Sequence, residues 1–328
     1  MIQTRGLVKR YGAFTAVDGV DLSIQPGEIY GFLGPNGAGK TSTILMLLGI
    51  TRPTSGEITL FGERFTPDRL DLRRRIGVVP EKHPRGSWQG MTAEEYLQMF
   101  AALFRVPRAA ERIRVLLQKV DLLAVRNRRI GAFSHGMLQK LSITRALLHD
   151  PDVLFLDEPI SGLDPLGIRQ TRDLLASENR AGRAIFISSH QLSEMERLCH
   201  RVAIISRGRL LAEATMSGLL SRMGTGREIQ VELESVPTDL PAALGALAPV
   251  QGVRLLPNGI AVRVAEEGDH RKTVSGFLVR RGLIPLRIDV VTPTLEEAFI
   301  TITQESVADL AAHAGAAAEA AQDRGAPP

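Results

Sequence analysis

Cysteine and long apolar stretches are what this chain of 328 residues most clearly lacks. It contains a single cysteine, Cys199, which excludes an internal disulfide bond and suits a reducing compartment. No apolar run approaches the ~18 residues that a membrane-spanning helix needs. The N-terminal residues MIQTR also lack the apolar segment of a signal peptide. We therefore expect a chain that neither spans a membrane nor is exported.

Lysine is scarce as well, since only 6 of the 40 basic residues are Lys. The net charge is only +4, and the basic residues are spread along the chain. The one tight cluster, Arg73-Arg74-Arg75, directly precedes an apolar run and is more typical of a solvated helix face than of a phosphate groove. Composition and charge therefore give no reason to expect a nucleic-acid partner.

Residues 34–41, GPNGAGKT, match the P-loop pattern G-x-x-x-x-G-K-[ST]. The preceding run from Ile29 to Leu33 is short, apolar and bounded by glycines, as a central parallel strand should be. The residues from Thr43 to Leu48 have a helical pattern. Strand, loop and helix in this order predict a site for a nucleoside triphosphate.

Each residue type in the loop suits phosphate binding. The glycines let the backbone turn tightly so that several N–H groups face phosphate oxygens, and the helix adds its positive N-terminal dipole. Lys40 supplies a positive charge for the β- and γ-phosphates, and the Thr41 hydroxyl is placed to bind Mg²⁺. The predicted nucleotide-binding residues of the loop are Gly34, Pro35, Asn36, Gly37, Ala38, Gly39, Lys40, Thr41 and Ser42.

A second apolar run, Val153 to Leu156, ends in two carboxylates, Asp157 and Glu158. Ligands of open α/β sheets bind at the carboxyl ends of the strands. Asp157 is therefore expected to hold Mg²⁺ directly or through water, and Glu158 to polarise an attacking water as general base. An acidic pair after a strand is often only a helix cap, but the upstream P-loop favours the catalytic interpretation.

Residues 1 to about 222 alternate strand-like and helical stretches, which predicts an α/β domain with a largely parallel sheet. A mainly helical stretch from about residue 84 to 148 predicts an inserted helical subdomain. The expected strands are Ile29 to Leu33, Ile76 to Val79, Val153 to Leu156, Ala184 to Ile187 and Val202 to Ile205. The expected helices of the insert are Thr92 to Phe104, Ala109 to Val120 and Met137 to Leu148.

A smaller α+β domain is expected over residues 226–304, followed by an Ala-rich and mostly disordered tail, 306–328. Its strands are expected at residues 228–234, 253–256, 260–264 and 286–291, and its helix at 270–281. Pro257-Asn258-Gly259 gives a hairpin signal between two of these strands.

With these motifs in place, residues 1 to about 222 resemble the ATPase subunit of ATP-binding-cassette (ABC) transporters. Ser134-His135-Gly136-Met137 lies where that family has its signature motif, ahead of the acidic strand. Residues 161–164, SGLD, resemble the family's D-loop. His190, in Ser-Ser-His, resembles its switch histidine, and Tyr11 resembles the aromatic residue that stacks on adenine.

The resemblance implies that two copies pair head to tail, with each signature closing over the γ-phosphate on the other copy's P-loop. It implies that His190 contacts the γ-phosphate and positions the water with Glu158, while Asp164 couples the two sites. The implied ligands are ATP and Mg²⁺. The implied partners are a separately encoded transmembrane permease and a second ATPase copy, identical or paralogous, with no nucleic acid. The chain would then lie at the cytoplasmic face of the membrane, held peripherally through its permease.

Three positions depart from the usual family pattern. Glu81 stands where a Gln usually contacts Mg²⁺ and the attacking water; its carboxylate can still bind the metal but adds negative charge. His135 and Met137 stand where Gly and Gln are usual. These departures resemble the exporter subgroup whose ATPases carry a small C-terminal domain. Residues 292–299, TPTLEEAF, are similar to the closing motif of that domain.

A cassette ATPase that acts on nucleic acid or at the ribosome is the alternative class. Only residues 42–132 separate the P-loop from the signature, without a long heptad run, and the chain has one P-loop. Both features favour transport over that alternative. The smaller domain could sense a ligand or promote dimerisation, and antibiotic, lipid or polysaccharide cargo all remain open.

Overall fold

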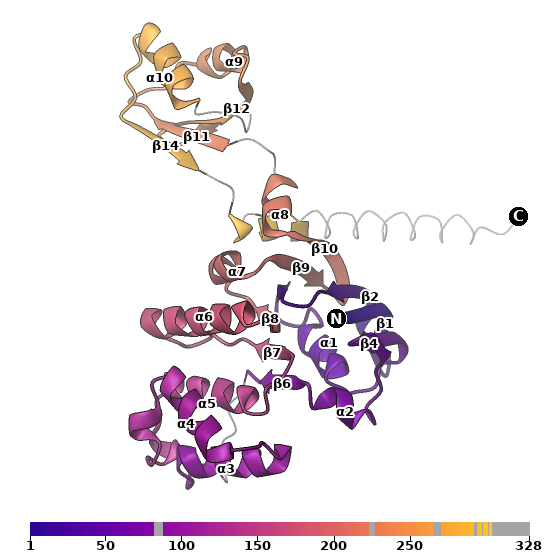
Figure 1. Cartoon of the computed structure of the whole chain (residues 1–328). Coiled ribbons are helices and arrows are strands. Elements are labelled where there is room, and N and C mark those ends of the chain that lie inside the picture. The colour runs from indigo at the N-terminus through magenta and orange to yellow at the C-terminus, as the bar shows by residue number, and fades with distance from the viewer. Residues whose placement is uncertain are drawn as a thin grey trace, which may run out of the picture. The chain divides into compact units, whose positions relative to one another are not determined.

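The computed structural model describes residues 1–81, 88–222, 227–264, 270–291, 294–296, 298–300 and 302–303. The chain folds as two compact units, one containing Met1–Met216 and the other Ser217–Thr301 (Figure 1). Within the described residues, no helix is long and apolar enough to cross a membrane. The predicted disordered tail lies outside the described residues.

A six-stranded sheet in the first unit carries all five predicted strands. Its order is β10-β9-β3-β8-β7-β6, parallel throughout except where β10 runs antiparallel to β9. The central strand β3 is buried at every residue, as its uninterrupted apolar run predicts. The strands are β3 (Ile29–Leu33), β6 (Ile76–Val79), β7 (Val153–Asp157), β8 (Ala184–Ser189), β9 (Arg201–Ser206) and β10 (Arg209–Thr215).

The first unit also contains a second, antiparallel sheet, which was not predicted. Its order is β2-β1-β4-β5. Register shifts interrupt the pairing of β1 with both of its neighbours, so the alternation of buried and exposed residues is irregular and the sequence pattern is weak. The strands are β1 (Ile2–Tyr11), β2 (Phe14–Ile24), β4 (Ser55–Leu60) and β5 (Glu63–Arg64).

One hydrophobic core joins the two sheets through helix α1 (Lys40–Leu47). Ile44 and Met46 of α1 belong to the same buried cluster as Val20 of the antiparallel sheet and Phe32 and Phe186 of the parallel sheet. This shared burial fixes the start of α1 against β3, where the P-loop lies. The short helix α2 (Leu70–Arg73) leads into β6, and Arg73, Arg74 and Arg75 at and after its end are exposed.

The helices α3 (Ala93–Phe104), α4 (Ala109–Lys119) and α5 (His135–Leu147) lie between β6 and β7 in the chain and gather beside β6 (Figure 1). Two short 3-10 turns, Leu123–Val125 and Ile130–Ala132, link α4 to α5. All three predicted helices are confirmed. Thr92 caps α3 in a reciprocal capping box with Glu95, and α5 begins earlier than predicted because Ser134 caps it. Two further helices connect strands of the parallel sheet: α6 (Pro165–Arg180) joins β7 to β8, and α7 (Leu192–Leu198) joins β8 to β9.

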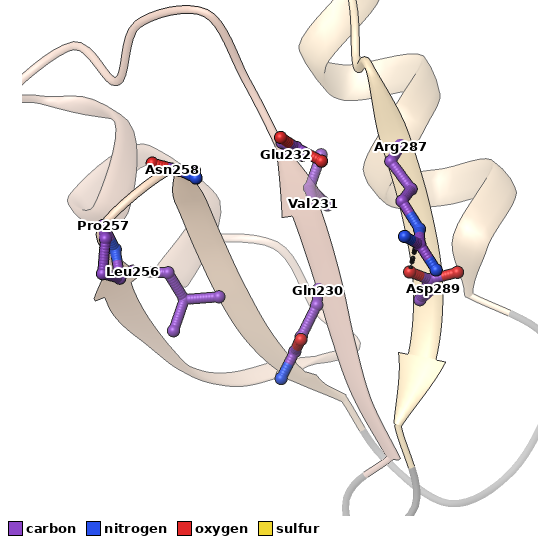
Figure 2. A pocket seen from close by; sticks show the side chains of 8 residues that line it. All are labelled: Gln230, Val231, Glu232, Leu256, Pro257, Asn258, Arg287 and Asp289. Atoms are coloured by element: carbon purple, nitrogen blue, oxygen red, sulfur yellow. Dashed lines mark ion pairs between the residues drawn. The ribbon is translucent and has the colours of Figure 1, made fainter.

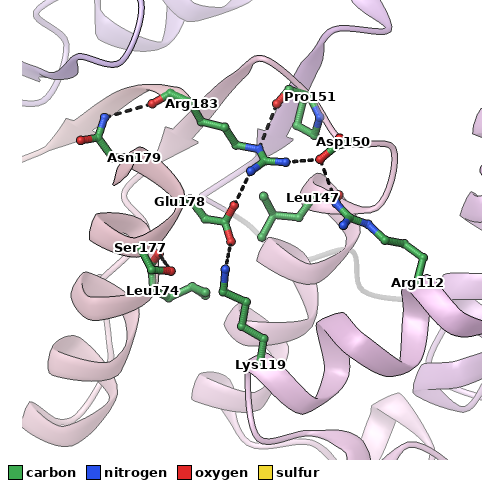
Figure 3. A network of polar contacts seen from close by, with 10 residues as sticks. All are labelled: Arg112, Lys119, Leu147, Asp150, Pro151, Leu174, Ser177, Glu178, Asn179 and Arg183. Atoms are coloured by element: carbon green, nitrogen blue, oxygen red, sulfur yellow. Dashed lines mark hydrogen bonds and ion pairs between the residues drawn. The ribbon is translucent and has the colours of Figure 1, made fainter. Parts of the chain in front are cut away.

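A polar network connects α4 to α6 and to Arg183, the residue that directly precedes β8 (Figure 3). The Glu178 carboxylate, 3% exposed, accepts from Lys119 and, at 2.7 Å, from Arg183. Asp150 is paired with Arg183 and, at 3.1 Å, with Arg112 of α4. Because a buried carboxylate is costly unless paired, this network fixes the position of α4 against the sheet.

The second unit contains an antiparallel sheet with α9 (Leu240–Gly245) and α10 (Arg271–Arg280) on one side (Figure 1). The strand order is β12-β13-β11-β14. The predicted hairpin is confirmed, since Leu256 pairs with Gly259 across the two-residue turn. The short helix α9 was not predicted, because Leu240 and Leu244 are its only buried residues. The elements are α8 (Met216–Arg222), β11 (Arg227–Glu232), α9 (Leu240–Gly245), β12 (Val250–Leu256), β13 (Gly259–Val264), α10 (Arg271–Arg280) and β14 (Arg287–Val291).

Candidate functional site

The P-loop leaves β3 and turns directly into α1, and two of its glycines are required by close contacts. A Cβ atom at Gly34 would lie 2.4 Å from the carbonyl oxygen of Ile205, and one at Gly39 would lie 2.5 Å from that of Ala16. Gly39 also has a φ of 106°, a conformation that favours glycine. The loop therefore packs against β9 and β2 with no room for a side chain at either position.

The Lys40 side chain is held inside the loop. Its Nζ donates to the carbonyl oxygens of Gly34 at 2.6 Å and Pro35 at 3.3 Å, and the residue is 8% exposed. Burial lowers the pKa of Lys40, while the carboxylates of Glu158, Asp157 and Glu81 act in the opposite direction. Lys40 is thus a buried lysine whose positive charge is favoured by three nearby carboxylates.

Asp157 and the end of β8 meet at the carboxyl edge of the sheet because β7 and β8 are parallel neighbours. The Ser188 hydroxyl donates to Asp157 Oδ1. Burial raises the pKa of Asp157, and the nearby charges of Glu81 and Glu158 raise it further, against the opposing effects of Ser188 and Lys40. This edge therefore carries a surplus of negative charge.

Glu158 and His190 form a pair beside Asp157. Glu158 has a left-handed φ of 50°, and its N–H donates to the Ser188 carbonyl oxygen at 3.0 Å. Its Oε2 lies 2.9 Å from Nδ1 of His190 and accepts from the Ser189 hydroxyl at 3.3 Å. The Glu158 side chain is 9% exposed and that of His190 58%. A shielded carboxylate therefore contacts an accessible imidazole, a geometry suited to handling the proton of a water molecule.

Tyr11 shares a pocket of about 240 Å³ with residues 35–42, which include all of the P-loop motif except Gly34. The pocket also includes Phe14, which is not among the predicted binding residues. Tyr11 and Phe14 pair across the turn between β1 and β2, and both rings are largely exposed, at 48% and 64%. The signal for Phe14 was its position three residues after Tyr11 in a chain with few aromatic residues. Two exposed rings beside a phosphate loop can hold a planar base.

The predicted signature begins α5, where Ser134 Oγ accepts from the Met137 N–H at 3.3 Å. Figure 1 shows α1 and α5 on opposite sides of β6 and β7, so the structure does not bring the signature to the P-loop of the same chain. His135 Nε2 instead lies 2.9 Å from the carbonyl oxygen of Ser161, in the predicted D-loop. Gly136 would accept a Cβ atom, whose nearest neighbour would be a Leu163 methyl carbon at 3.7 Å.

Asp164 and Glu81 are two further predicted site residues. Asp164 caps α6, with its Oδ1 accepting from the Gly167 N–H at 2.7 Å. Glu81 is exposed and acts on Lys40 and Asp157 through its charge. The family resemblance also implies that the segment around Glu81 to Gly90 contacts the permease. Residues 82–87 of that segment lie outside the described residues.

Among the described residues, no group of three or more His, Cys, Asp and Glu side chains is arranged to hold a metal ion. The candidate metal ligands are two carboxylates, Asp157 and Glu81, with the Thr41 hydroxyl at the start of α1. Mg²⁺ in nucleotide sites is commonly bound by one or two carboxylates together with substrate phosphates. A P-loop facing carboxylates at the edge of a parallel sheet defines the class of P-loop nucleoside triphosphatases.

Comparison with known proteins narrows that class. A family model described as ABC transporter matches residues 17–161. The bacitracin transport ATP-binding protein of Bacillus licheniformis is 37% identical over 92% of this chain and 97% of its own length. The linearmycin resistance ATP-binding protein of Bacillus subtilis is 31% identical over 94% of this chain and 100% of its own length. The chain belongs to the ATP-binding subunits of ABC transporters, which hydrolyse ATP to drive transport.

A solved structure of an ATP-binding subunit of an ABC transporter matches the fold, with a TM-score of 0.63 and 30% identity over 68% of this chain and 93% of the other. The Nod factor export ATP-binding protein I of Burkholderia pseudomallei is 43% identical over 62% of this chain and 67% of its own length. The resemblance drawn from the sequence motifs is therefore confirmed at the level of the family.

Proposed function

We propose that this chain powers export through a separate transmembrane permease, by ATP-driven pairing of two ATPase copies. The observation that carries the direction of transport is similarity to a Nod factor export ATP-binding protein, 43% identical over 62% of the chain. Similarity to the bacitracin transport protein over 92% of the chain, a span that includes the second unit, supports a role in transport. The chain would then lie peripherally at the cytoplasmic face of the membrane.

In the proposed reaction, Glu158 accepts a proton from the attacking water, and His190 orients that water and contacts the γ-phosphate. Their 2.9 Å contact supports this division of roles. Lys40 exchanges its two carbonyl partners for phosphate oxygens, and Tyr11 stacks on the adenine. The surplus negative charge around Asp157 fits a bound cation. Thr41, Asp157 and Glu81 would hold Mg²⁺, which supplies charge neutralisation of the phosphates.

The signature is proposed to act on the second copy. Ser134 and Gly136 lie in the first turn of α5, where backbone N–H groups and the helix dipole favour an anion. The contact of His135 with the Ser161 carbonyl oxygen gives the signature a direct link to the D-loop that ends at Asp164. Closure of the pair over ATP would therefore change the position of the D-loop, which follows Glu158 in each chain.

The test is the Glu158→Gln variant, purified from mildly solubilised membranes with ATP present. It should keep ATP binding while hydrolysis falls by roughly 10²–10⁴, and mass spectrometry should find a membrane-spanning permease with it. Glu57→Gln, an exposed change in β4 of the same unit, is the matched control and should hydrolyse ATP normally. Unchanged turnover in Glu158→Gln contradicts the catalytic role. Recovery of ribosomes or nucleic acid instead of a permease contradicts transport.

A further inference from the structure

Strand β14 forms one edge of the sheet in the second unit. It pairs with β11 and, within the described part of the chain, with no other strand. An exposed edge presents backbone N–H and C=O groups that can pair with another strand, and natural proteins usually protect such edges.

Exposed apolar side chains gather in the segment that runs from the end of α10 through β14. Val279, Ile284, Leu286 and Val290 are 57%, 76%, 59% and 38% exposed. Exposed apolar side chains that lie close together are common at interaction sites of soluble domains. The edge of β14 therefore combines free backbone groups with apolar side chains.

The register of the sheet shows which backbone groups face the free edge. The Leu233 N–H donates to the Asn258 carbonyl oxygen, so odd-numbered residues of β11 direct their backbone groups toward β13 and even-numbered ones toward β14. Even-numbered residues of β11 pair with odd-numbered residues of β14. Because the direction alternates along a strand, the backbone groups of Ile288 and Val290 point to the free edge.

The charges on β14 are self-complementary. Arg287 and Asp289 extend from the same face of the strand, with Nε 2.6 Å from Oδ2 and side chains 70% and 46% exposed (Figure 2). If two β14 strands pair antiparallel about an axis through Ile288, Arg287 of each copy lies opposite Asp289 of the other. Opposite charges in directly facing positions stabilise a strand pair, and like charges destabilise it.

Ile288 faces its own equivalent in the same register. Leu286 precedes β14, and its N–H donates to the Glu232 carbonyl oxygen of β11 at 2.9 Å, so it is not counted in the pairing. A shift of the axis to residue 289 instead places the two Asp289 carboxylates opposite each other. The register centred on Ile288 therefore pairs each charge with an opposite charge and places an apolar residue at the axis.

We propose that β14 is a dimerisation edge, on which a second copy of this chain adds its own β14 antiparallel to form a sheet continuous across both copies. This contact needs no nucleotide, unlike the pairing proposed for the ATPase units. It would keep two ATPase units at high effective concentration after ATP is hydrolysed.

The first test is sedimentation equilibrium of the full chain without nucleotide, which should show a dimer. Arg287→Asp and Asp289→Arg should each weaken that dimer about tenfold, because two ion pairs per interface become like-charge pairs. The double variant carrying both reversals should restore the wild-type affinity. Arg254→Asp reverses a charge that is 65% exposed on the opposite edge strand, β12, and should leave the dimer unchanged.

Cysteine cross-linking tests the register. Ile288→Cys should give a disulfide-linked dimer on mild oxidation, because directly facing residues lie about 5.5 Å apart between Cα atoms, within disulfide reach. Val290→Cys is the control and should not cross-link to its equivalent. The native Cys199 is buried, and burial raises its pKa to about 12, so it should not interfere.

A chain that sediments as a monomer without ATP overturns the proposal, and so does a dimer that both single reversals leave intact. A double reversal that stays monomeric, or equal cross-linking at positions 288 and 290, overturns the register. None of these results bears on the ATPase assignment, whose tests are made with nucleotide bound.

Discussion

At the scale of single residues, Tyr11 should set the affinity for the base of the nucleotide. Its exposed ring shares the pocket with the P-loop. Tyr11→Ala should weaken ATP binding on the order of tenfold, since stacking on a base contributes about 1–3 kcal/mol, whereas Tyr11→Trp should retain binding. Titration with a fluorescent ATP analogue measures both variants. An unchanged affinity in Tyr11→Ala, with Phe14→Ala weakened instead, would assign the stacking to Phe14.

Ionisation of the Asp157 carboxyl group should make the nucleotide-free protein less stable. Burial raises its pKa, so the folded state binds the proton more tightly than the unfolded state does. The cost of ionisation begins as the pH rises above the unfolded pKa, about 3.9, and is fully present above the folded pKa. At neutral pH, Asp157→Asn should therefore raise the melting temperature while abolishing hydrolysis. The difference in melting temperature should shrink as the pH falls toward 4. A variant less stable than wild type at neutral pH would contradict this account.

At the scale of elements, the network around Glu178 should decide how firmly α4 is fixed to the sheet. Glu178→Gln keeps the shape but leaves Lys119 without its carboxylate and Arg183 with Asp150 alone of its two carboxylate partners. Breaking such a buried pair costs about 3–5 kcal/mol, less where a partner is partly exposed, so we expect a loss of roughly 2–4 kcal/mol in urea unfolding. Asp150→Asn removes a carboxylate that is 71% exposed and should cost under about 1 kcal/mol. Equal losses in the two variants would show that burial does not control the network.

The accuracy with which the sequence predicted each strand depends on how completely that strand is buried. The parallel strands are short apolar runs because helices cover both sheet faces, and Ile29–Leu33 and Ile76–Val79 were placed at their observed ends. The antiparallel sheet was missed because its buried positions alternate irregularly through register shifts. Phe14 was missed for a related reason, since its place beside the P-loop depends on the pairing of β1 with β2. Its spacing of three residues from Tyr11 was a local signal, but that spacing alone does not place the ring beside the P-loop.

At the scale of the whole molecule, pairing in trans predicts that two inactive variants restore each other. Lys40→Ala removes the P-loop charge, and Gly136→Asp places a carboxylate in the first turn of α5, facing the expected phosphate. Gly136→Asp should fold, because a Cβ atom there meets only ordinary contacts and an acidic residue in a first turn stabilises a helix. Each variant alone should hydrolyse ATP hardly at all, and Gly136→Asp should still bind it.

A mixed pair of these variants contains one site with an intact P-loop from one chain and an intact signature from the other. Mixing should therefore recover a measurable part of wild-type ATPase activity, assayed by phosphate release. Mixing Lys40→Ala with Ser134→Ala/Gly136→Asp should recover activity to a similar extent, because both defects of the second chain lie in the same signature. A mixture of Lys40→Ala/Gly136→Asp with Glu158→Gln should stay inactive, since neither possible site is complete. If the first mixture remains as inactive as its components, the signature does not act across the pair. Full activity of Gly136→Asp alone would lead to the same conclusion.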